Sequence, residues 1–420
     1  METISTFVFS VGLIIFAAHF FTALFERTKI PDVLPLIFIG IIVGPLLGIL
    51  SPNDFGYVGP LLSAVALTLM LFEGGSHLTL ETLKSSLKDS VILALTTFLI
   101  TVVASSCFAY FLMKIDLIPA LFIGTVLGSI SPAVVIPIVR MLNLSDNTKS
   151  MLVVESAITD VLSIIIGLAI LKTFQAGHNT IMEFIGTDLI ATMAMSLLLG
   201  FGGAVIWSVI LEKIRKFPNT IFTTLAFIFL LYGSAEILGY NGPISVLIFG
   251  VVLANSKKIP LNIVQRFGAD HLTEFTSIEK TLFSEVIFLV KTFFFIFLGI
   301  SIQFGNFKIM IMGAILTAII YSCRLILCRF LVTKNTHVSE AAMISFMIPK
   351  GLAAAVLAEV PMHMGLHQEA ISIFTEIRAI IYIVILLSIL LTAILIYGQE
   401  SGITQKTYER FFSKSDSFST

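Results

Sequence analysis

Two acidic residues lie inside one long apolar stretch of the chain. Glu155 and Asp160 belong to the segment 151–171, whose other residues are almost all apolar. An ionised carboxylate at bilayer depth costs roughly 2.5–3.5 kcal/mol on insertion scales, so such residues usually mark an ion or proton pathway. On a helix Ser156 and Asp160 share a face, whereas Glu155 points about 140° away from Asp160. The two carboxylates are therefore predicted to have different tasks.

The composition is that of a chain embedded in lipid. Mean hydropathy is +1.03, and only 12% of the residues are charged, about half the fraction of a soluble domain. A chain of 420 residues can hold a dozen or more spanning helices of about 20 residues each. The net charge of −1 gives no reason to expect nucleic acid as a partner. Since the sequence shows no phosphate loop, nucleophile elbow or metal-ligand cluster, we predict neither an enzyme nor a bound cofactor.

Thirteen apolar spans can be counted, which predicts an all-α polytopic membrane protein. They cover residues 4–25, 31–50, 58–76, 90–113, 117–139, 150–171, 184–211, 219–238, 241–256, 283–303, 309–328, 338–361 and 369–398. The loops after the odd-numbered spans, with the C-terminal tail, hold 18 lysines and arginines, and the alternate loops hold three. This bias predicts an N-terminus outside and a C-terminus in the cytoplasm. The default location is a bacterial-type plasma (inner) membrane. The long loop 257–282 suits an amphipathic helix on the cytoplasmic face or a plain linker.

Two of the spans contain prolines near their middle. Pro132 lies in span 117–139, and Pro349 lies in span 338–361. Proline removes a backbone donor and disfavours helix in the residue before it, so each span is predicted to be broken there. The breaks are seven spans apart. This spacing suits two inverted six-helix repeats, with span 184–211 as a linker helix and the two discontinuous helices crossing near the midplane.

A few further charged residues fall inside or close to the spans. Arg324 is given two possible tasks, an interhelical contact or the gating of a cytoplasmic funnel. Arg378 is expected to extend its charged end to the membrane interface. Glu340 and Glu359 lie within a few residues of a span end and are given no task.

Several short motifs follow one another along the chain. They are Pro31–Pro45, Leu71–Gly75, Ser131–Val135, Glu155-Ser156-x-x-Thr159-Asp160 and Lys350-Gly351. In this order and spacing they resemble the motifs of the monovalent cation/proton antiporter superfamily. The branch they resemble most is that of the NhaP-type sodium/proton antiporters. The resemblance extends from about residue 10 to residue 398.

The resemblance implies a homodimer in which a mobile core moves against a dimerisation part. We expect spans 1–3 and 8–10 to form the dimerisation part and spans 4–6 and 11–13 to form the core, both within residues 1–400, with 401–420 as a short cytoplasmic tail. Asp160 is implied to bind cation and proton in competition. The residues implied to complete the oxygen shell of the ion are Ser156, Ser129 and Ser131. Thr159 is expected to add a further hydroxyl oxygen. Glu155 is implied to form a structural ion pair with a basic residue of the second broken helix, here Lys350.

On these grounds the sequence predicts exchange of a monovalent cation for H⁺ by alternating access, as in pH homeostasis. Na⁺ is preferred over K⁺ or Li⁺, and one titrating carboxylate favours one-for-one, electroneutral exchange. Thr159 before Asp160 leaves the stoichiometry open, and Ser131 in place of an aspartate leaves the cation open. Lys350 stands where the family usually has arginine. Three alternatives remain: a potassium efflux system gated by a separate subunit, a sodium-coupled symporter of organic anions on the same fold, and a non-transporting scaffold.

Overall fold

The computed structural model describes most of the chain. The described residues are 9, 12–20, 33–55, 58–77, 87–175, 187–214, 217, 222–255, 276–302, 304, 306–332, 336–404, 408 and 411–412. Within these ranges all regular secondary structure is helical, without a strand. The greater part of the predicted amphipathic segment 257–282 lies outside them, and its last residues, from Ser277, belong to the helix that follows.

The helices coincide with the predicted spans. They are α2 (Val33–Ile41), α3 (Val58–His77), α5 (Leu87–Phe111), α6 (Leu117–Gly128), α7 (Pro132–Met141), α8 (Asp146–Gln175), α10 (Thr187–Ile214), α11 (Thr223–Ile237), α12 (Gly242–Ala254), α14 (Ser277–Ser301), α15 (Phe307–Leu331), α16 (Val338–Phe346), α17 (Leu352–Glu359) and α18 (Gln368–Glu400). Short π- or 3₁₀-helical turns follow at Ile42–Leu46, Pro52–Phe55 and Val360–His363. The first predicted span is described as helix over residues 12–20. The all-helical membrane fold is confirmed.

The chain divides into two compact units. The first comprises Met1–Gly56, Ser86–Leu171 and Phe295–Thr420, and the second comprises Tyr57–Ser85 and Lys172–Phe294. The predicted core spans 4–6 and 11–13 all lie in the first unit. Spans 1 and 2, which we expected with the dimerisation part, also belong to the first unit, and the expected linker 184–211 belongs to the second. The tasks of the two units stay predictions.

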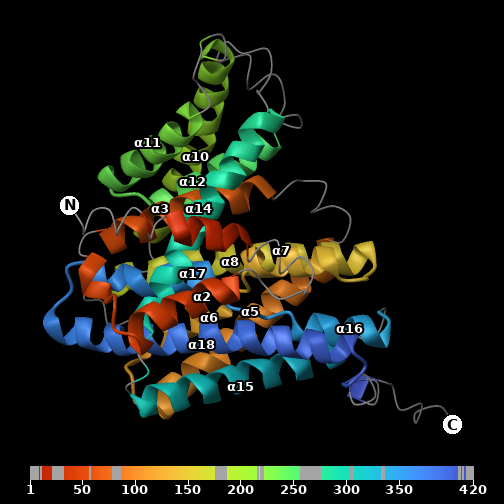
Figure 1. Cartoon of the computed structure of the whole chain (residues 1–420). Helices are drawn as coiled ribbons and strands as arrows, with labels where there is room; N and C mark the ends of the chain where they lie inside the picture. The colour runs from red at the N-terminus through yellow and green to blue at the C-terminus, as the bar shows by residue number, and fades with distance from the viewer. Residues whose placement is uncertain are drawn as a thin grey trace. The chain divides into compact units, whose positions relative to one another are not determined.

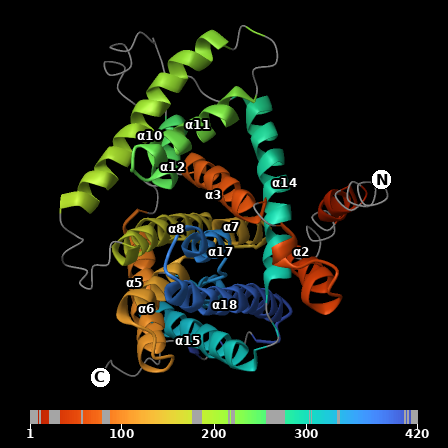
Figure 2. The ribbon, with the colours of Figure 1, turned by 90° about the vertical axis from the view of Figure 1, so that its left-hand side faces the viewer.

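Close helix contacts build the first unit. Figure 1 and Figure 2 both show α15 lying along α18, and α5 packs against α6. A Cβ atom at Gly124 of α6 would lie 2.1 Å from the Ser106 hydroxyl oxygen of α5. The hydroxyls of Tyr321 and Thr392 lie 2.5 Å apart and join α15 to α18. The helices that carry the two acidic residues and both broken spans are therefore held in one packed body.

The second unit has an apolar core of its own. α3 and α12 approach closely, since a Cβ atom at Gly75 would lie 2.2 Å from the carbonyl oxygen of Leu247. Trp207 of α10 stacks on Phe227 of α11, with ring centroids 4.6 Å apart. The Trp207 indole N–H donates to the hydroxyl of Thr224 at 3.2 Å, so the one polar atom of this large side chain is satisfied.

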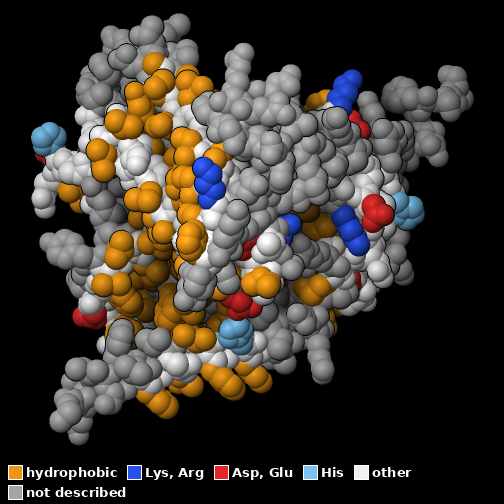
Figure 3. All heavy atoms as spheres, turned by 90° about the horizontal axis from the view of Figure 1, so that it is seen from above, with side chains coloured by type: hydrophobic (Ala, Val, Ile, Leu, Met, Phe, Trp, Pro, Cys, Tyr) orange, Lys and Arg blue, Asp and Glu red, His pale blue; other side chains and the backbone are white. Residues whose placement is uncertain are grey.

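Many large apolar side chains point outward. Leu99, Ile206 and Leu230 are 62, 51 and 65% exposed, and Figure 3 shows hydrophobic side chains gathered over a wide area of one face. Seven helices in the described ranges are long and apolar enough to cross a membrane, and further apolar helices are shorter. Lipid provides the environment in which such a surface is stable.

Candidate functional site

The first broken span is interrupted where proline predicted it. α6 ends at Gly128, the backbone of Ser129 and Ser131 is extended, and α7 begins at Pro132. Proline is well placed as the first residue of a helix because its missing N–H is not needed there. The break leaves the carbonyl groups of the last turn of α6 without helical partners. One of them, that of Val126, accepts the Ser129 N–H at 3.5 Å and the Ser163 hydroxyl of α8 at 3.4 Å.

The second broken span has the same construction. α16 ends at Phe346, and α17 begins at Leu352. The residues between them, 347–351, include Pro349 and are buried. Both predicted breaks are thus confirmed, and each lies between two short helices of one span.

The two breaks touch each other. The Ser131 N–H donates to the carbonyl oxygen of Pro349 at 2.9 Å. A Cβ atom at Gly351 would lie only 2.2 Å from the Ser131 hydroxyl oxygen and 2.5 Å from its Cβ. The predicted crossing of the two discontinuous helices is therefore present, and its close approach depends on glycine at position 351.

We expect Gly351→Ala to disturb this crossing. The new methyl group would overlap Ser131, so one break must shift, and overpacking of this kind costs about 1–3 kcal/mol. The measurement is thermal unfolding of the detergent-purified protein together with ion-dependent proton flux in vesicles. Gly202→Ala in α10 is the matched control, because a Cβ there would meet no atom within 4 Å. Equal behaviour of the two variants would contradict the tight crossing.

Lys350 is fully buried at the crossing. Its backbone N–H donates to the Ser388 hydroxyl of α18 at 2.9 Å, and its ammonium group donates to the Ser129 carbonyl at 2.8 Å. The ammonium group lies next to the carboxyl end of α6, where the helix dipole favours a positive charge. Lys350 thus stabilises the open end of the first broken helix.

Asp160 of α8 combines burial with an unused oxygen. The residue as a whole is partly exposed, but its Oδ1 atom is buried and has no hydrogen-bond partner among the described residues. The hydroxyl of Ser129 interacts electrostatically with this carboxylate, as does the Lys350 ammonium group. The Ser129 hydroxyl is itself buried and makes no hydrogen bond of standard geometry within the described ranges. Two hard oxygen atoms with free lone pairs are the kind of ligand that a hard monovalent cation prefers.

The hydroxyl of Thr159 already has a structural task. It accepts the Ile130 N–H of the first break at 3.1 Å and donates to the Glu155 carbonyl at 2.9 Å. The hydroxyl of Ser156 donates to the Val153 carbonyl of its own helix at 2.9 Å. Thr159 therefore connects α8 to the first break, whereas the Ser156 oxygen keeps lone pairs for a ligand.

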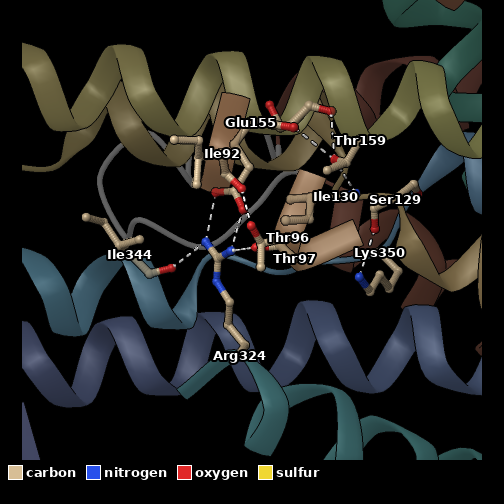
Figure 4. A network of polar contacts seen from close by, with 11 residues as sticks. Ile92, Thr96, Thr97, Ser129, Ile130, Glu155, Thr159, Arg324, Ile344 and Lys350 are labelled. Atoms are coloured by element: carbon tan, nitrogen blue, oxygen red, sulfur yellow. Dashed lines mark hydrogen bonds and ion pairs between the residues drawn. The ribbon is translucent and has the colours of Figure 1, made fainter. Parts of the chain in front are cut away.

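Glu155 pairs with Arg324, and the predicted pair of Glu155 with Lys350 is wrong. Both Arg324 terminal nitrogens donate to the Glu155 carboxylate, Nη1 to Oε1 and Nη2 to Oε2, the latter at 2.8 Å (Figure 4). The planar guanidinium group matches the two carboxylate oxygens, which a single ammonium group cannot do. The Lys350 ammonium group is instead directed to the Ser129 carbonyl.

Arg324 also joins four helices. Nη1 donates to the Thr97 hydroxyl of α5 at 2.6 Å, and Nη2 donates to the Ile344 carbonyl of α16 at 3.0 Å. Of the two tasks considered for Arg324, the structure shows the interhelical contact. The contribution of Thr97 was missed, because a single threonine in an apolar span gives no signal of its partner.

Crossed broken helices beside a buried carboxylate, in an all-helical membrane fold, are typical of secondary transporters. The family described as "Sodium/hydrogen exchanger, transmembrane" matches residues 14–397, and the chain belongs to this family.

Similar proteins and structures agree with this assignment. The chain is 26% identical over 335 residues to Na(+)/H(+) antiporter 1 of Methanocaldococcus jannaschii, which covers 74% of this chain and 71% of that protein. It is 22% identical over 260 residues to the K(+)/H(+) antiporter NhaP2 of Shewanella oneidensis, covering 60% of this chain and 45% of that protein. Its fold matches the solved structure of the sodium proton antiporter MjNhaP1 from M. jannaschii at pH 8, with a TM-score of 0.73, 22% identity, and coverage of 99% of this chain and 100% of that chain.

Proposed function

We propose that this protein exchanges a monovalent cation for a proton across a membrane by alternating access, with Asp160 as the residue that binds either one. The observation that carries the proposal is the buried Oδ1 atom of Asp160, which has no hydrogen-bond partner in the described ranges and lies beside the crossing. A buried polar oxygen without a partner is costly. Binding a proton or a cation removes that cost, so each can replace the other.

The charges around the site favour one-for-one exchange. Arg324 and Glu155 balance each other, and Lys350 lies within electrostatic range of Asp160. The empty site therefore has one positive and one negative group. Loading with H⁺ or with Na⁺ raises its charge by the same amount, so the two loaded forms are equivalent and the exchange is electroneutral.

The ligand set proposed for the cation is Asp160, Ser129 and Ser156, with Ser131 at the crossing close by. Thr159 supports the site through its bond to the first break. We propose Na⁺ as the preferred cation, because Na(+)/H(+) antiporter 1 of M. jannaschii is the relative with the greater coverage. K⁺ is the second candidate, supported by the K(+)/H(+) antiporter NhaP2. We further propose a homodimer in the plasma (inner) membrane, with the N-terminus outside and the C-terminus in the cytoplasm. The 18-to-3 distribution of basic residues supports this orientation.

The test is proton flux in vesicles that contain the purified protein. Addition of sodium, lithium, potassium or rubidium salt against a pH gradient should change the internal pH, with the strongest response to sodium. The rate should be the same when the membrane potential is clamped at different values. Absence of flux with every cation would reject the proposal, and a clear voltage dependence would reject electroneutral exchange alone. A response only to an added organic anion would favour the symporter.

A further inference from the structure

A second buried carboxylate lies away from the crossing. Glu359 is the last residue of α17 and is 4% exposed. Its Oε2 atom accepts a hydrogen bond from Nη1 of Arg378 at 2.9 Å, and its Oε1 atom accepts one from the Tyr382 hydroxyl. Both partners belong to α18. No role was predicted for Glu359 from the sequence, and Arg378 was expected at the membrane interface. In the structure the two side chains form a hydrogen-bonded pair.

Glu359 is buried although it carries an ionisable group. Burial of a charge has a desolvation cost, which only good pairing offsets. Arg378 and Tyr382, both on α18, supply that pairing and so link α17 to α18 at this point.

The opposite end of α17 is the crossing. α17 has eight residues, so it is about 12 Å long. At its beginning the Lys350 N–H is bonded to Ser388 of α18, and Gly351 packs on Ser131. Arg378 and Ser388 are ten positions apart on α18, a rise of about 15 Å. Their partners Glu359 and Lys350 are nine positions apart in the sequence, which is a similar spacing. α18 therefore holds this half-helix at both ends.

We propose that Glu359 is a positioning residue for transport. Through Arg378 and Tyr382 it fixes the outer end of α17 on α18, and this fixes the place of Gly351 and Lys350 beside Asp160. A short rigid helix that loses its anchor at one end shifts at the other end, where the cation binds. The inference rests on the proposed exchange of cation and proton.

The experiment compares Glu359→Gln and Tyr382→Phe with a matched control in purified, reconstituted protein. The control is Glu376→Gln, which removes a carboxylate from α18, the helix that carries Arg378 and Tyr382. Glu376 forms an exposed 3.6 Å pair with Lys308. We expect the cation KM to rise about three- to tenfold in the two test variants, the effect of losing one hydrogen bond of ordinary strength. The maximal rate should change less, and the control should keep the wild-type KM.

Variants of Arg378 separate positioning from general stability. Arg378 uses one nitrogen on Glu359, so Arg378→Lys should keep a KM near that of the wild type, and Arg378→Gln should not. The double variant Glu359→Gln/Arg378→Gln has no unpaired buried charge and should recover thermal stability while its KM stays raised. If a single variant does not fold, the KM of the double variant tests the inference in its place.

A wild-type KM in Glu359→Gln, or in the double variant, would overturn the inference. Recovery of stability and KM together in the double variant would also overturn it, because the pair would then be structural only. Lack of flux in the wild-type protein would instead reject the proposed function.

Discussion

Asp160→Asn should abolish cation-dependent proton flux in vesicles while the protein stays folded. Asparagine has nearly the same shape, but it has no charge for the cation and takes up no proton at working pH. Because the Oδ1 atom of Asp160 makes no hydrogen bond within the described ranges, its replacement breaks no hydrogen bond of that atom. The melting temperature should change little, because the variant removes the desolvation cost of the carboxylate together with its electrostatic interaction with Lys350.

The control for this variant is Glu376→Gln, which removes an exposed carboxylate of the same unit. It should transport at the wild-type rate. Normal transport by Asp160→Asn would show that the ion site lies elsewhere, and the proposed mechanism would then fail. Loss of transport together with a much lower melting temperature would show that Asp160 supports the fold and would contradict its assignment as a free ligand.

The features of the fold that depend on local chemistry could be predicted from the sequence. Spans follow from apolar length, and Pro132 and Pro349 marked the two breaks because proline acts on its own neighbourhood. Their crossing followed from the equivalent positions of the breaks in two repeats. The identity of the touching residues, Ser131 with Pro349 and Gly351, required the structure.

Pairings between distant residues could not be predicted in the same way. Arg324 and Lys350 are both basic residues inside the predicted spans, so the sequence alone allowed either one to pair with Glu155. The choice between them depends on where each side chain points. The guanidinium group of Arg324 points toward α8, and the ammonium group of Lys350 points toward the end of α6. Glu359 was set aside for a similar reason, because its position near a span end gave no sign that Arg378 lies opposite.

The contact that Thr159 makes could not be predicted either. Thr159 was expected to be an ion ligand, but neighbouring positions on a helix point in different directions. In the structure its hydroxyl is directed to the first break and holds the Ile130 N–H. A buried N–H at an interrupted helix needs a partner, and the Thr159 hydroxyl supplies it.

Arg324→Ala should destabilise the protein far more than any change at Asp160. It leaves Glu155, 1% exposed, as a buried charge without its partner, which costs about 3–5 kcal/mol. The Thr97 hydroxyl and the Ile344 carbonyl lose their donors as well. Glu155→Ala should likewise be more destabilising than Asp160→Ala, because it leaves the guanidinium group without its carboxylate. Denaturant titration of the purified protein in detergent measures the difference in the free energy of unfolding.

Two comparisons make this expectation specific. Lys308→Ala breaks an ion pair whose lysine side chain is 65% exposed, so it should cost at most about 1 kcal/mol. The double variant Glu155→Gln/Arg324→Gln removes both buried charges and should be more stable than Arg324→Ala, since no uncompensated charge remains.

If Arg324→Ala is no less stable than Lys308→Ala, then another basic residue must pair with the Glu155 carboxylate. Lys350 is a base within electrostatic range of Glu155. The double variant Arg324→Ala/Lys350→Ala tests whether Lys350 then pairs with Glu155. Additive losses of stability exclude this new pair, and a combined loss larger than the sum of the two single losses reveals it.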